Sequence, residues 1–275
     1  MSDRLPQDLA EVLDASGSRL GDFARLHYYV DVGSTNDVAL SLAAAGAGEG
    51  TAILADQQRT GRGRLGRTWF SPPGAGMYLS VIVRPGKADW LSLTTLAAGV
   101  AVARAVISVS ALPIGLKWPN DLVIGRPWRK VGGVLCESAG SGTEIEAVVV
   151  GIGVNLELAA TPPELADVAT SIEAELGRPV ERSRLVVEVL AELRAILNRL
   201  RDGQRSAVCD EWRRFGRPGL GGARVRWDEQ GIERSGLARD LDDTGALLVE
   251  SAGKVERLIA GEVRWDRPGT GTELS

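Results

Sequence analysis

The feature that most constrains this chain is the segment at residues 57–69, which reads Gln-Gln-Arg-Thr-Gly-Arg-Gly-Arg-Leu-Gly-Arg-Thr-Trp. Glycines let the backbone approach a ligand closely, and arginines supply planar donors that suit carboxylates and phosphates. The segment, called the glycine–arginine loop below, is therefore expected to close over an anion. Two other interpretations remain at this point: an exposed basic turn, and an arginine–glycine patch that contacts RNA.

The loop also satisfies G-x-G-x-x-G, through Gly61, Gly63 and Gly66, after a strand-like run. That fingerprint needs a helix that opens at the third glycine and an acidic residue about 20 residues later. Pro72 and Pro73 prevent a helix there, and a glycine and a lysine occupy the acidic position. A Rossmann-type dinucleotide site is therefore excluded, and the sequence contains no G-x-x-x-x-G-K-[ST] phosphate loop.

Composition narrows the possible functions further. A length of 275 residues allows one large domain or a large and a small one, and the net charge of −4 disfavours a general nucleic-acid binder. A single histidine, His27, nearly excludes zinc sites and histidine triads, while Cys136 and Cys209 form no disulfide framework. We find no signal-peptide layout and no 18-residue apolar run, so we expect a cytoplasmic protein without a membrane span.

Hydrophobic patterns predict the elements of the first part of the chain. The helix expected at 90–110 is apolar on all sides, which is typical of burial against a sheet. Strands are expected at 28–32, 51–58, 77–83, 115–124, 130–137 and 146–156, and helices at 37–45, 90–110, 162–176, 183–200 and 206–215.

The pattern changes after Arg217-Pro218-Gly219 to short alternating strands separated by turn signals, which predicts a small β-barrel. We therefore expect three parts: a domain at 1–217, a small C-terminal domain at 218–268 and a disordered tail at 269–275. The barrel strands are expected at 222–227, 233–241, 246–250, 254–260 and 262–265.

Three further segments carry polar residues where chemistry is possible. In Lys-Trp-Pro-Asn-Asp at 117–121, Asn120 could bind a ligand and Asp121 could hold Mg²⁺ or a sugar hydroxyl, although a turn stabilised by these side chains is also possible. Lys130 lies shortly before a Gly-Gly pair. Its mobile cation could follow the charge of a phosphate, or the residue could be a solvent-exposed lysine without a role. Ser34 and Thr35 either cap the following helix or bind a ligand at its N-terminus.

Taken in order, these segments resemble the biotin protein ligase family. The matching pieces cover roughly residues 25–266 and include a C-terminal small barrel. They are Gly-Ser-Thr-Asn (33–36), Gln58 with Gly-Arg-Gly-Arg-Leu-Gly-Arg-Thr-Trp (61–69), Lys-Trp-Pro-Asn-Asp (117–121), Lys130 with Gly133 and Leu135, and Gly-Ile-Gly-Val-Asn (151–155).

The resemblance implies an α+β fold: a mixed β-sheet with helices on one face, related to class II aminoacyl-tRNA synthetases, plus an SH3-like C-terminal β-barrel. It also implies an ATP-dependent ligase. In that family the biotin carboxylate attacks the α-phosphate of ATP, with Mg²⁺, to give biotinyl-5′-AMP, and a lysine of a biotin carboxyl carrier domain then accepts the biotin.

The resemblance also implies roles for individual residues. Lys130 and Arg64 would be the catalytic residues, and Asp121 would contact the metal. The expected biotin-binding residues are Ser34, Thr35, Asn36, Gln58, Arg62, Gly63, Arg64, Lys130, Gly133, Leu135, Gly151 and Gly153. The expected ATP-binding residues are Arg64, Arg67, Trp69, Asn120, Asp121 and Asn155.

Two departures from the family pattern bear on these roles. Residues 125–128 lengthen the connection between Asp121 and Lys130, and Gln57 stands beside Gln58, so the glutamine assignment is open by one residue. The N-terminus is too short for the DNA-binding winged helix of the repressor type, so no operator binding is expected. The rival functions are a lipoate–protein ligase, a regulator that binds biotin or biotinyl-AMP without transferring it, and an RNA-binding module.

Overall fold

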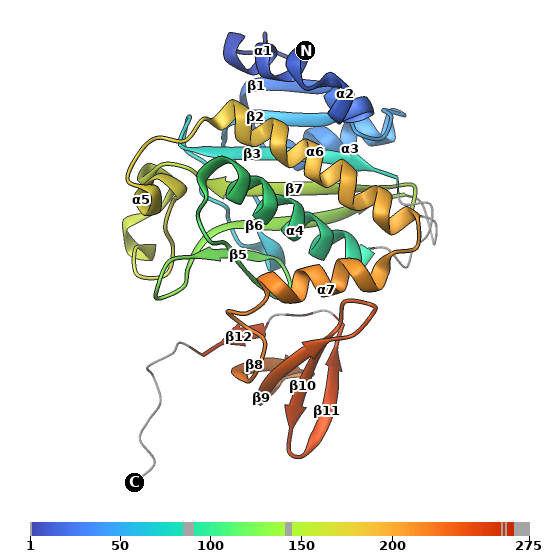
Figure 1. The fold of residues 1–275 in the computed structure, drawn as a ribbon, viewed down its shortest axis with the longest axis vertical. Helices are drawn as coiled ribbons and strands as arrows, with labels where there is room; N and C mark the ends of the chain where they lie inside the picture. The colour runs from blue at the N-terminus through green and yellow to red at the C-terminus, as the bar shows by residue number, and fades with distance from the viewer. Residues whose placement is uncertain (1, 85–90, 141–144, 260, 262, 267–275) are drawn as a thin grey trace.

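The computed structural model describes residues 2–84, 91–140, 145–259, 261 and 263–266, and these form two β-sheets. The first has seven strands in the order β1-β2-β3-β7-β6-β5-β4 (Figure 1). β1 and β2 pair in parallel and the other neighbours in this sheet pair antiparallel, so the predicted mixed sheet is confirmed. The strands are β1 Leu26–Val32, β2 Ala52–Gln58, β3 Gly76–Val83, β4 Gly115–Lys117, β5 Asp121–Ile124, β6 Arg129–Ala139 and β7 Ala147–Asn155.

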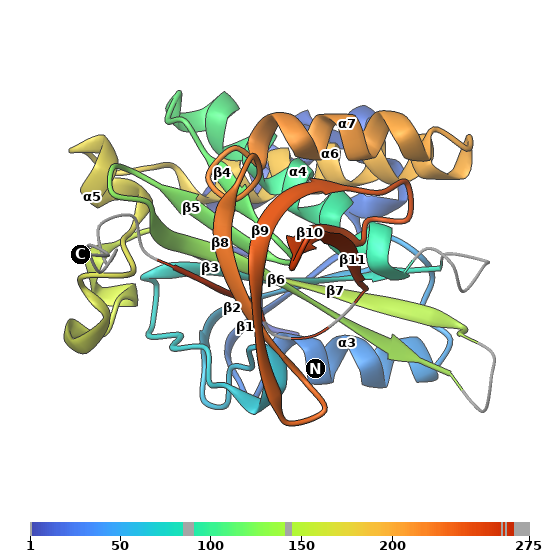
Figure 2. The ribbon, with the colours of Figure 1, turned by 90° about the horizontal axis from the view of Figure 1, so that it is seen from below.

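Helices cover both faces of this sheet. The long helices α4 (Leu91–Ser110) and α6 (Arg182–Arg201) lie on one face, with α7 (Arg205–Phe215) below them and α1 (Gln7–Ala15) at the top (Figure 1). The predicted apolar stripe of α6 is buried, as expected of a core helix. The prediction placed the helices on one face, but α3 (Thr35–Ala44) lies on the other (Figure 2).

The face under α3 has its own small core. Ala39 and Ala43 of α3 pack there with Ile53, Ile82 and Val149, which come from three strands. These strand residues alternate with neighbours that point into the larger core under α4 and α6. Since both faces of the central strand β3 are covered, all of its residues are buried.

Part of α4, the stretch Leu93–Ser110, is long and apolar enough to cross a membrane by composition, contrary to the expectation that no such run exists. In the structure 72% of that stretch is buried. It packs between the sheet and the helices α6 and α7. The apolar composition of this helix is therefore accounted for by its place in the core.

The helix predicted at 162–176 is wrong. The structure has a single 3-10 turn at Pro163–Leu165 and a short helix α5 at Ile172–Leu176. Between them the backbone pairs with β6 instead, since Lys130 N–H donates to Val168 O (2.8 Å) and Thr170 N–H donates to Lys130 O (2.8 Å). The remaining short elements are α2 Gly17–Leu20 and 3-10 turns at Gly21–Ala24, Arg64–Gly66 and Leu158–Ala160.

The second sheet is antiparallel, with the order β11-β10-β9-β8-β12. The predicted strands are present, although residues 260, 262 and the tail at 269–275 lie outside the described residues. Closure into an SH3-like barrel and a domain boundary at 217/218 stay predictions. The strands are β8 Ala223–Glu229, β9 Ile232–Leu241, β10 Leu247–Ser251, β11 Lys254–Leu258 and β12 Val263–Trp265.

Two tryptophans join the sheets. The indole N–H of Trp118, which is buried, donates to Gly245 O (2.9 Å), and that of Trp265 donates to Trp118 O (3.2 Å). The two sheets are therefore held together by directed hydrogen bonds as well as by apolar contact.

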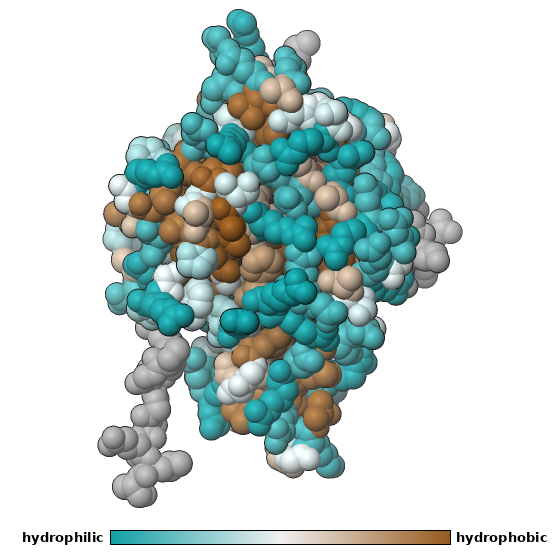
Figure 3. Space-filling view, in the orientation of Figure 1, coloured by the Kyte–Doolittle hydropathy of each residue, from teal (hydrophilic) through white to brown (hydrophobic). Residues whose placement is uncertain are grey.

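The surface that carries α4, α6 and α7 is mainly hydrophilic, with apolar patches beside α5 and on the C-terminal sheet (Figure 3).

Replacing Trp118 by Phe should lower the free energy of unfolding by about 1–3 kcal/mol, because the buried Gly245 carbonyl loses its partner. Trp128→Phe, at a half-buried position in the β5–β6 connection, is the matched control. Urea denaturation of both variants measures the difference. Equal stability of the two variants would show that the bond to Gly245 contributes nothing.

Candidate active site

A pocket of about 530 Å³ lies on the α3 face of the first sheet. It begins where β7 changes from branched to small residues. Val149 packs against α3, whereas Gly151 and Gly153, which point to the same face because side chains alternate along a strand, leave room. The two glycines therefore let other side chains of the pocket lie directly against this strand.

The glycines are required by the side chains that lie against them. A Cβ on Gly151 would stand 2.3 Å from Asn36 Oδ1, and one on Gly153 would stand 2.6 Å from the Trp69 indole. Gly133 pairs with Gly153 on the neighbouring strand, and a Cβ there would meet Lys130 atoms at 3.6 Å, an ordinary contact. Gly151 and Gly153 are therefore required by the side chains packed on them, whereas Gly133 is not.

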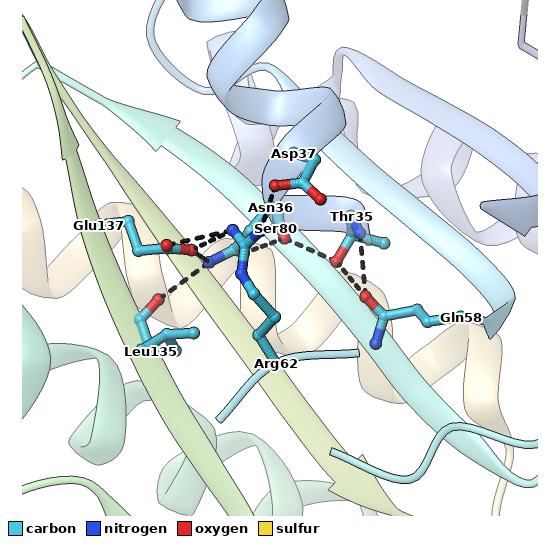
Figure 4. Close-up of polar contacts among 8 residues, drawn as sticks. All are labelled: Thr35, Asn36, Asp37, Gln58, Arg62, Ser80, Leu135 and Glu137. Atoms are coloured by element: carbon cyan, nitrogen blue, oxygen red, sulfur yellow. Dashed lines mark hydrogen bonds and ion pairs between the residues drawn. The ribbon is translucent and has the colours of Figure 1, made fainter. Parts of the chain in front are cut away.

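One end of the pocket is lined by uncharged hydrogen-bonding groups. Ser34 is the N-cap residue of α3 but makes no side-chain capping bond. Instead Gln58 Oε1 accepts from the Thr35 N–H (2.9 Å) and hydroxyl (3.1 Å), and Gln58 Nε2 donates to Ser71 Oγ (2.9 Å) (Figure 4). Because the backbone N–H can only donate, it fixes the orientation of the Gln58 amide. Gln58 thus accepts from the first backbone N–H of α3 and lines the pocket at the same time.

Asn36 lies beside these groups and is 4% exposed. Its Nδ2 donates to Glu137 Oε2 (2.6 Å) and Leu135 O (3.4 Å), and its Oδ1 accepts from the buried hydroxyl of Ser80 (2.6 Å) (Figure 4). Neither Ser80 nor Glu137 was predicted from the sequence, because Ser80 is a small polar residue in an apolar strand and Glu137 belongs to no recognisable motif. Both nevertheless determine how Asn36 presents its amide.

The other end of the pocket is cationic. Lys130 Nζ lies 2.5 Å from Asp121 Oδ1 and 5.4 Å from the centroid of the Trp69 ring. The β5–β6 hairpin brings this pair together, since its longer connection at 125–128 serves as the turn and β6 returns alongside β5. The extra residues therefore leave Lys130 facing Asp121, Trp69 and the pocket.

The arginines of the loop point in different directions. Arg64 donates to Asn120 Oδ1 (3.4 Å) and to the Gly261 carbonyl (3.2 Å), so it bridges the pocket to the second sheet. Arg62 instead contacts Asp37 and Glu137. Burial opposes the Arg62 charge, but the hydrogen bonds that Arg62 donates to both carboxylates outweigh it and raise the pKa of Arg62.

The tip of the loop is a tight turn. Leu65 has φ of 57° and Gly66 of 73°, and Leu65 is 65% exposed. The Gly63 N–H donates to Arg67 O (2.7 Å), and Trp69 N–H donates to Gly61 O (2.9 Å). A left-handed leucine is strained. The helix that a dinucleotide fingerprint requires is replaced by this turn.

Every residue to which the resemblance assigns a catalytic, biotin, ATP or metal role lines this pocket. The set is Ser34, Thr35, Asn36, Gln58, Arg62, Gly63, Arg64, Arg67, Trp69, Asn120, Asp121, Lys130, Gly133, Leu135, Gly151, Gly153 and Asn155. Their division into biotin-binding, ATP-binding and metal-binding residues stays a prediction.

Comparison with known proteins places this geometry in a family. A family model described as "Biotin/lipoate A/B protein ligase family" matches residues 29–155, and one described as "Biotin protein ligase C terminal domain" matches 224–264. The biotin–[acetyl-CoA-carboxylase] ligase of Mycobacterium tuberculosis is 37% identical over 268 residues, 94% of each chain. The chain belongs to the biotin protein ligase family.

Two other relatives illustrate the range of the biotin protein ligase family. The bifunctional ligase/repressor BirA of Bacillus spizizenii is 30% identical over 242 residues, 86% of this chain and 73% of that protein. A biotin protein ligase from Aquifex aeolicus, solved in complex with biotin and ATP, superposes with a TM-score of 0.74 at 27% identity, covering 89% of this chain and 99% of that one. Both the sequence and the fold therefore support the assignment.

Residues beyond the predicted set also line the pocket of this ligase family member. Some come from the segment at 160–169, most of which was predicted to be helical, and some from the second sheet. Asn155, which is 5% exposed, ties this segment in place by donating to Thr170 O (3.1 Å). The additional residues include Ala160, Pro162, Glu164, Leu165, Ala169, Val263 and Trp265.

The donor set of the pocket bears on the expected metal. Among the described residues no group of three or more His, Cys, Asp or Glu side chains could hold a metal ion. Asp121 offers one carboxylate, and that carboxylate is paired with Lys130. Mg²⁺ at phosphate sites is commonly bound through one or two carboxylates and the substrate phosphates, so Asp121 suits an ion that arrives with a nucleotide.

Gly153→Ala should lower the free energy of unfolding by about 1–3 kcal/mol, because its methyl group would displace the Trp69 indole. Gly133→Ala, at the paired position on β6, meets only ordinary contacts and should change stability by less than about 0.5 kcal/mol. Chemical denaturation of both variants measures the contrast. Equal losses would mean that Trp69 does not pack on β7 as described.

Proposed function

We propose that this protein is an ATP-dependent ligase that joins biotin to AMP and then transfers biotin to a lysine of a biotin carboxyl carrier domain. The observation that carries the proposal is a pocket with a hydrogen-bonding end at Asn36 and Gln58 and a cationic end at Lys130 and Arg64. Its support is membership of the biotin protein ligase family and the similarity to a ligase solved with biotin and ATP.

The two ends are ordered along β7. Asn36 lies against Gly151, the Trp69 ring lies against Gly153 with Lys130 beside it, and Asn155 follows. Alternate residues of a strand are about 7 Å apart, so these groups succeed one another over roughly 14 Å. A long, narrow acid with a polar head fits this order, with its head at Asn36 and its carboxylate at Lys130.

The first chemical step needs two anions brought together. A carboxylate oxygen of biotin forms a bond to the α-phosphorus of ATP, and the bond from that phosphorus to the pyrophosphate oxygen breaks. Lys130 and Arg64 would offset the negative charge that gathers on the phosphate oxygens. Trp69 offers an aromatic face to the nucleotide, and Arg67, Asn120 and Asn155 offer polar contacts around it.

In the second step a lysine amine of the carrier bonds to the acyl carbon, the bond from that carbon to the AMP oxygen breaks, and the amine loses a proton. Water would hydrolyse the same mixed anhydride. The glycine–arginine loop covers the site between the steps, with Arg64 bound to Asn120 and to the second sheet. Mg²⁺ would enter with ATP, at Asp121 and the phosphate oxygens.

The main alternative is a lipoate–protein ligase, since one matching family model covers both kinds of enzyme. The match to a C-terminal domain described for biotin protein ligases, and relatives named for biotin, favour biotin. We also propose a cytoplasmic location, which the two free cysteines support.

The proposed function is tested by incubating the protein with ATP, Mg²⁺, biotin and a carrier domain, and measuring the mass of the carrier. We expect the mass to rise by one biotinyl group, and not when lipoate replaces biotin. A carrier modified only with lipoate would establish the alternative. Formation of bound biotinyl-AMP without transfer would indicate a regulator that binds the intermediate.

Lys130→Ala should slow pyrophosphate release by about 100-fold, because one preorganised cation is removed from the reacting phosphate. Lys254→Ala, at an exposed position on β11, is the control and should release pyrophosphate at the parent rate. Release from the Lys130 variant at the parent rate would remove Lys130 from the mechanism.

Arg64→Ala should release biotinyl-AMP about tenfold faster than the parent, since a charged hydrogen bond between loop and pocket is lost. The fold should be unaffected, because a loop arginine supports no core. Arg59→Ala removes an exposed arginine at the start of the same loop and serves as the control. Retention of the intermediate is measured by gel filtration after a single turnover, and unchanged retention would contradict the role of Arg64.

A further inference from the structure

Glu137 of β6 lies where the loop meets the wall of the pocket. Arg62 Nη2 donates to Glu137 Oε2 (2.8 Å) and Oε1 (3.1 Å), while Arg62 Nη1 contacts Asp37 in the first turn of α3 (Figure 4). The arginine thus fastens its side of the loop to a helix and a strand. Its guanidinium is occupied by carboxylates of the protein itself.

The same carboxylate holds a buried amide. Asn36 Nδ2 donates to Glu137 Oε2 (2.6 Å), and Asn36 Oδ1 accepts from Ser80, which is 0% exposed. An ionised carboxylate can only accept hydrogen bonds, so Glu137 allows one orientation of the Asn36 amide, with the NH₂ group toward β6. That orientation fixes which hydrogen bonds Asn36 can offer to a ligand.

From Asn36 the hydrogen bonds continue into the pocket. Ser80 Oγ lies 2.7 Å from Thr35 Oγ1, and the Thr35 hydroxyl and N–H both donate to Gln58 Oε1. Glu137 and Gln58 Oε1 are therefore the acceptors at the two ends of a row of polar groups that reaches the base of the loop. Hydrogen bonds to ionised groups are stronger than neutral ones, so Glu137 stabilises the end of the row that contains Asn36 and Ser80.

We propose that Glu137 is a positioning residue that links two events: closure of the loop through Arg62, and presentation of the Asn36 amide to the ureido head of biotin. This inference rests on the proposed function of the pocket and deepens it. The negative charge of Asp37 and Glu137 exceeds that of Arg62, so this end disfavours a carboxylate. Biotin is thereby oriented with its acid group toward Lys130.

An ordinary exposed ion pair would behave differently. Such pairs contribute little because water and salt screen them, as expected for Arg239 and Glu250, whose side chains are each 45% exposed. The Glu137 side chain is 30% exposed and has a buried partner in Asn36. Glu137→Gln and Glu250→Gln are therefore matched changes, each removing one charge beside an arginine.

Glu137→Gln should raise KM for biotin about tenfold, while kcat for pyrophosphate release at saturating biotin falls less than about threefold. The glutamine can donate as well as accept, so only the longer hydrogen bond to Leu135 O (3.4 Å) still favours one orientation of the Asn36 amide. Trypsin should also cut the loop faster at its arginines. Glu250→Gln should match the parent in KM, kcat and cleavage.

Arg62→Gln separates the two events. It frees the loop but leaves Asn36 bonded to Glu137, so cleavage should accelerate as in Glu137→Gln, with a smaller rise in KM for biotin. The KM for biotin and the rate of tryptic cleavage of the double variant should not exceed those of Glu137→Gln alone, since both changes break the same ion pair between Arg62 and Glu137. If Glu137→Gln fails to fold, Arg62→Gln still tests the link, and unchanged cleavage there overturns it.

Two results overturn the proposal outright: a KM for biotin in Glu137→Gln equal to that of the parent, or a KM rise no larger than in Arg62→Gln. A parent protein that makes no biotinyl-AMP would defeat the proposed function instead. In that case the cleavage of Glu137→Gln, compared with Glu250→Gln, still decides whether this carboxylate holds the loop.

Discussion

The structure depends on the absence of side-chain volume at two positions of one strand face. Along β7 the residues that face α3 change from Val149, which packs under the helix, to Gly151 and Gly153. Packed interiors leave few voids, so a cavity of this size needs walls that cannot collapse. Asn36 and Trp69 lie on the glycines and leave no space for a methyl group there. The same backbone thus supports a core at one end and a binding site at the other.

The two ends of the pocket differ in their charged groups as well as in their shape. Glu137 and Asp37 pair with Arg62 at one end, and Lys130 pairs with Asp121 at the other. Arg62 and Lys130 each have a carboxylate partner, so these two cations are held in place before a ligand binds, yet Lys130 can exchange its partner for an incoming phosphate. An arrangement of this kind binds an anion without first assembling the cations around it, which is what electrostatic catalysis requires.

Much of this could be predicted from the sequence. Three predicted parts of the site lie together because they are on neighbouring strands or on the loop after β2: the glycine–arginine loop, Lys130 and the glycines of β7. Their residue types indicate an anion site. The segment at 162–176 was misjudged because Lys130 draws its backbone into a bridge, a long-range pairing that local propensity does not contain. Ser80 and Glu137 escaped notice because their importance comes from Asn36, far away in sequence. The resemblance supplied the chemistry.

The central claim is that one pocket orders an acid and a nucleotide along β7. A crystal structure of the protein with biotinyl-5′-AMP tests it most directly. We expect the ureido ring beside Asn36 at Gly151, the phosphate within hydrogen-bonding distance of Lys130, and the adenine beyond Trp69. A ligand bound in the reverse direction, or one that contacts neither Asn36 nor Trp69, would contradict the account.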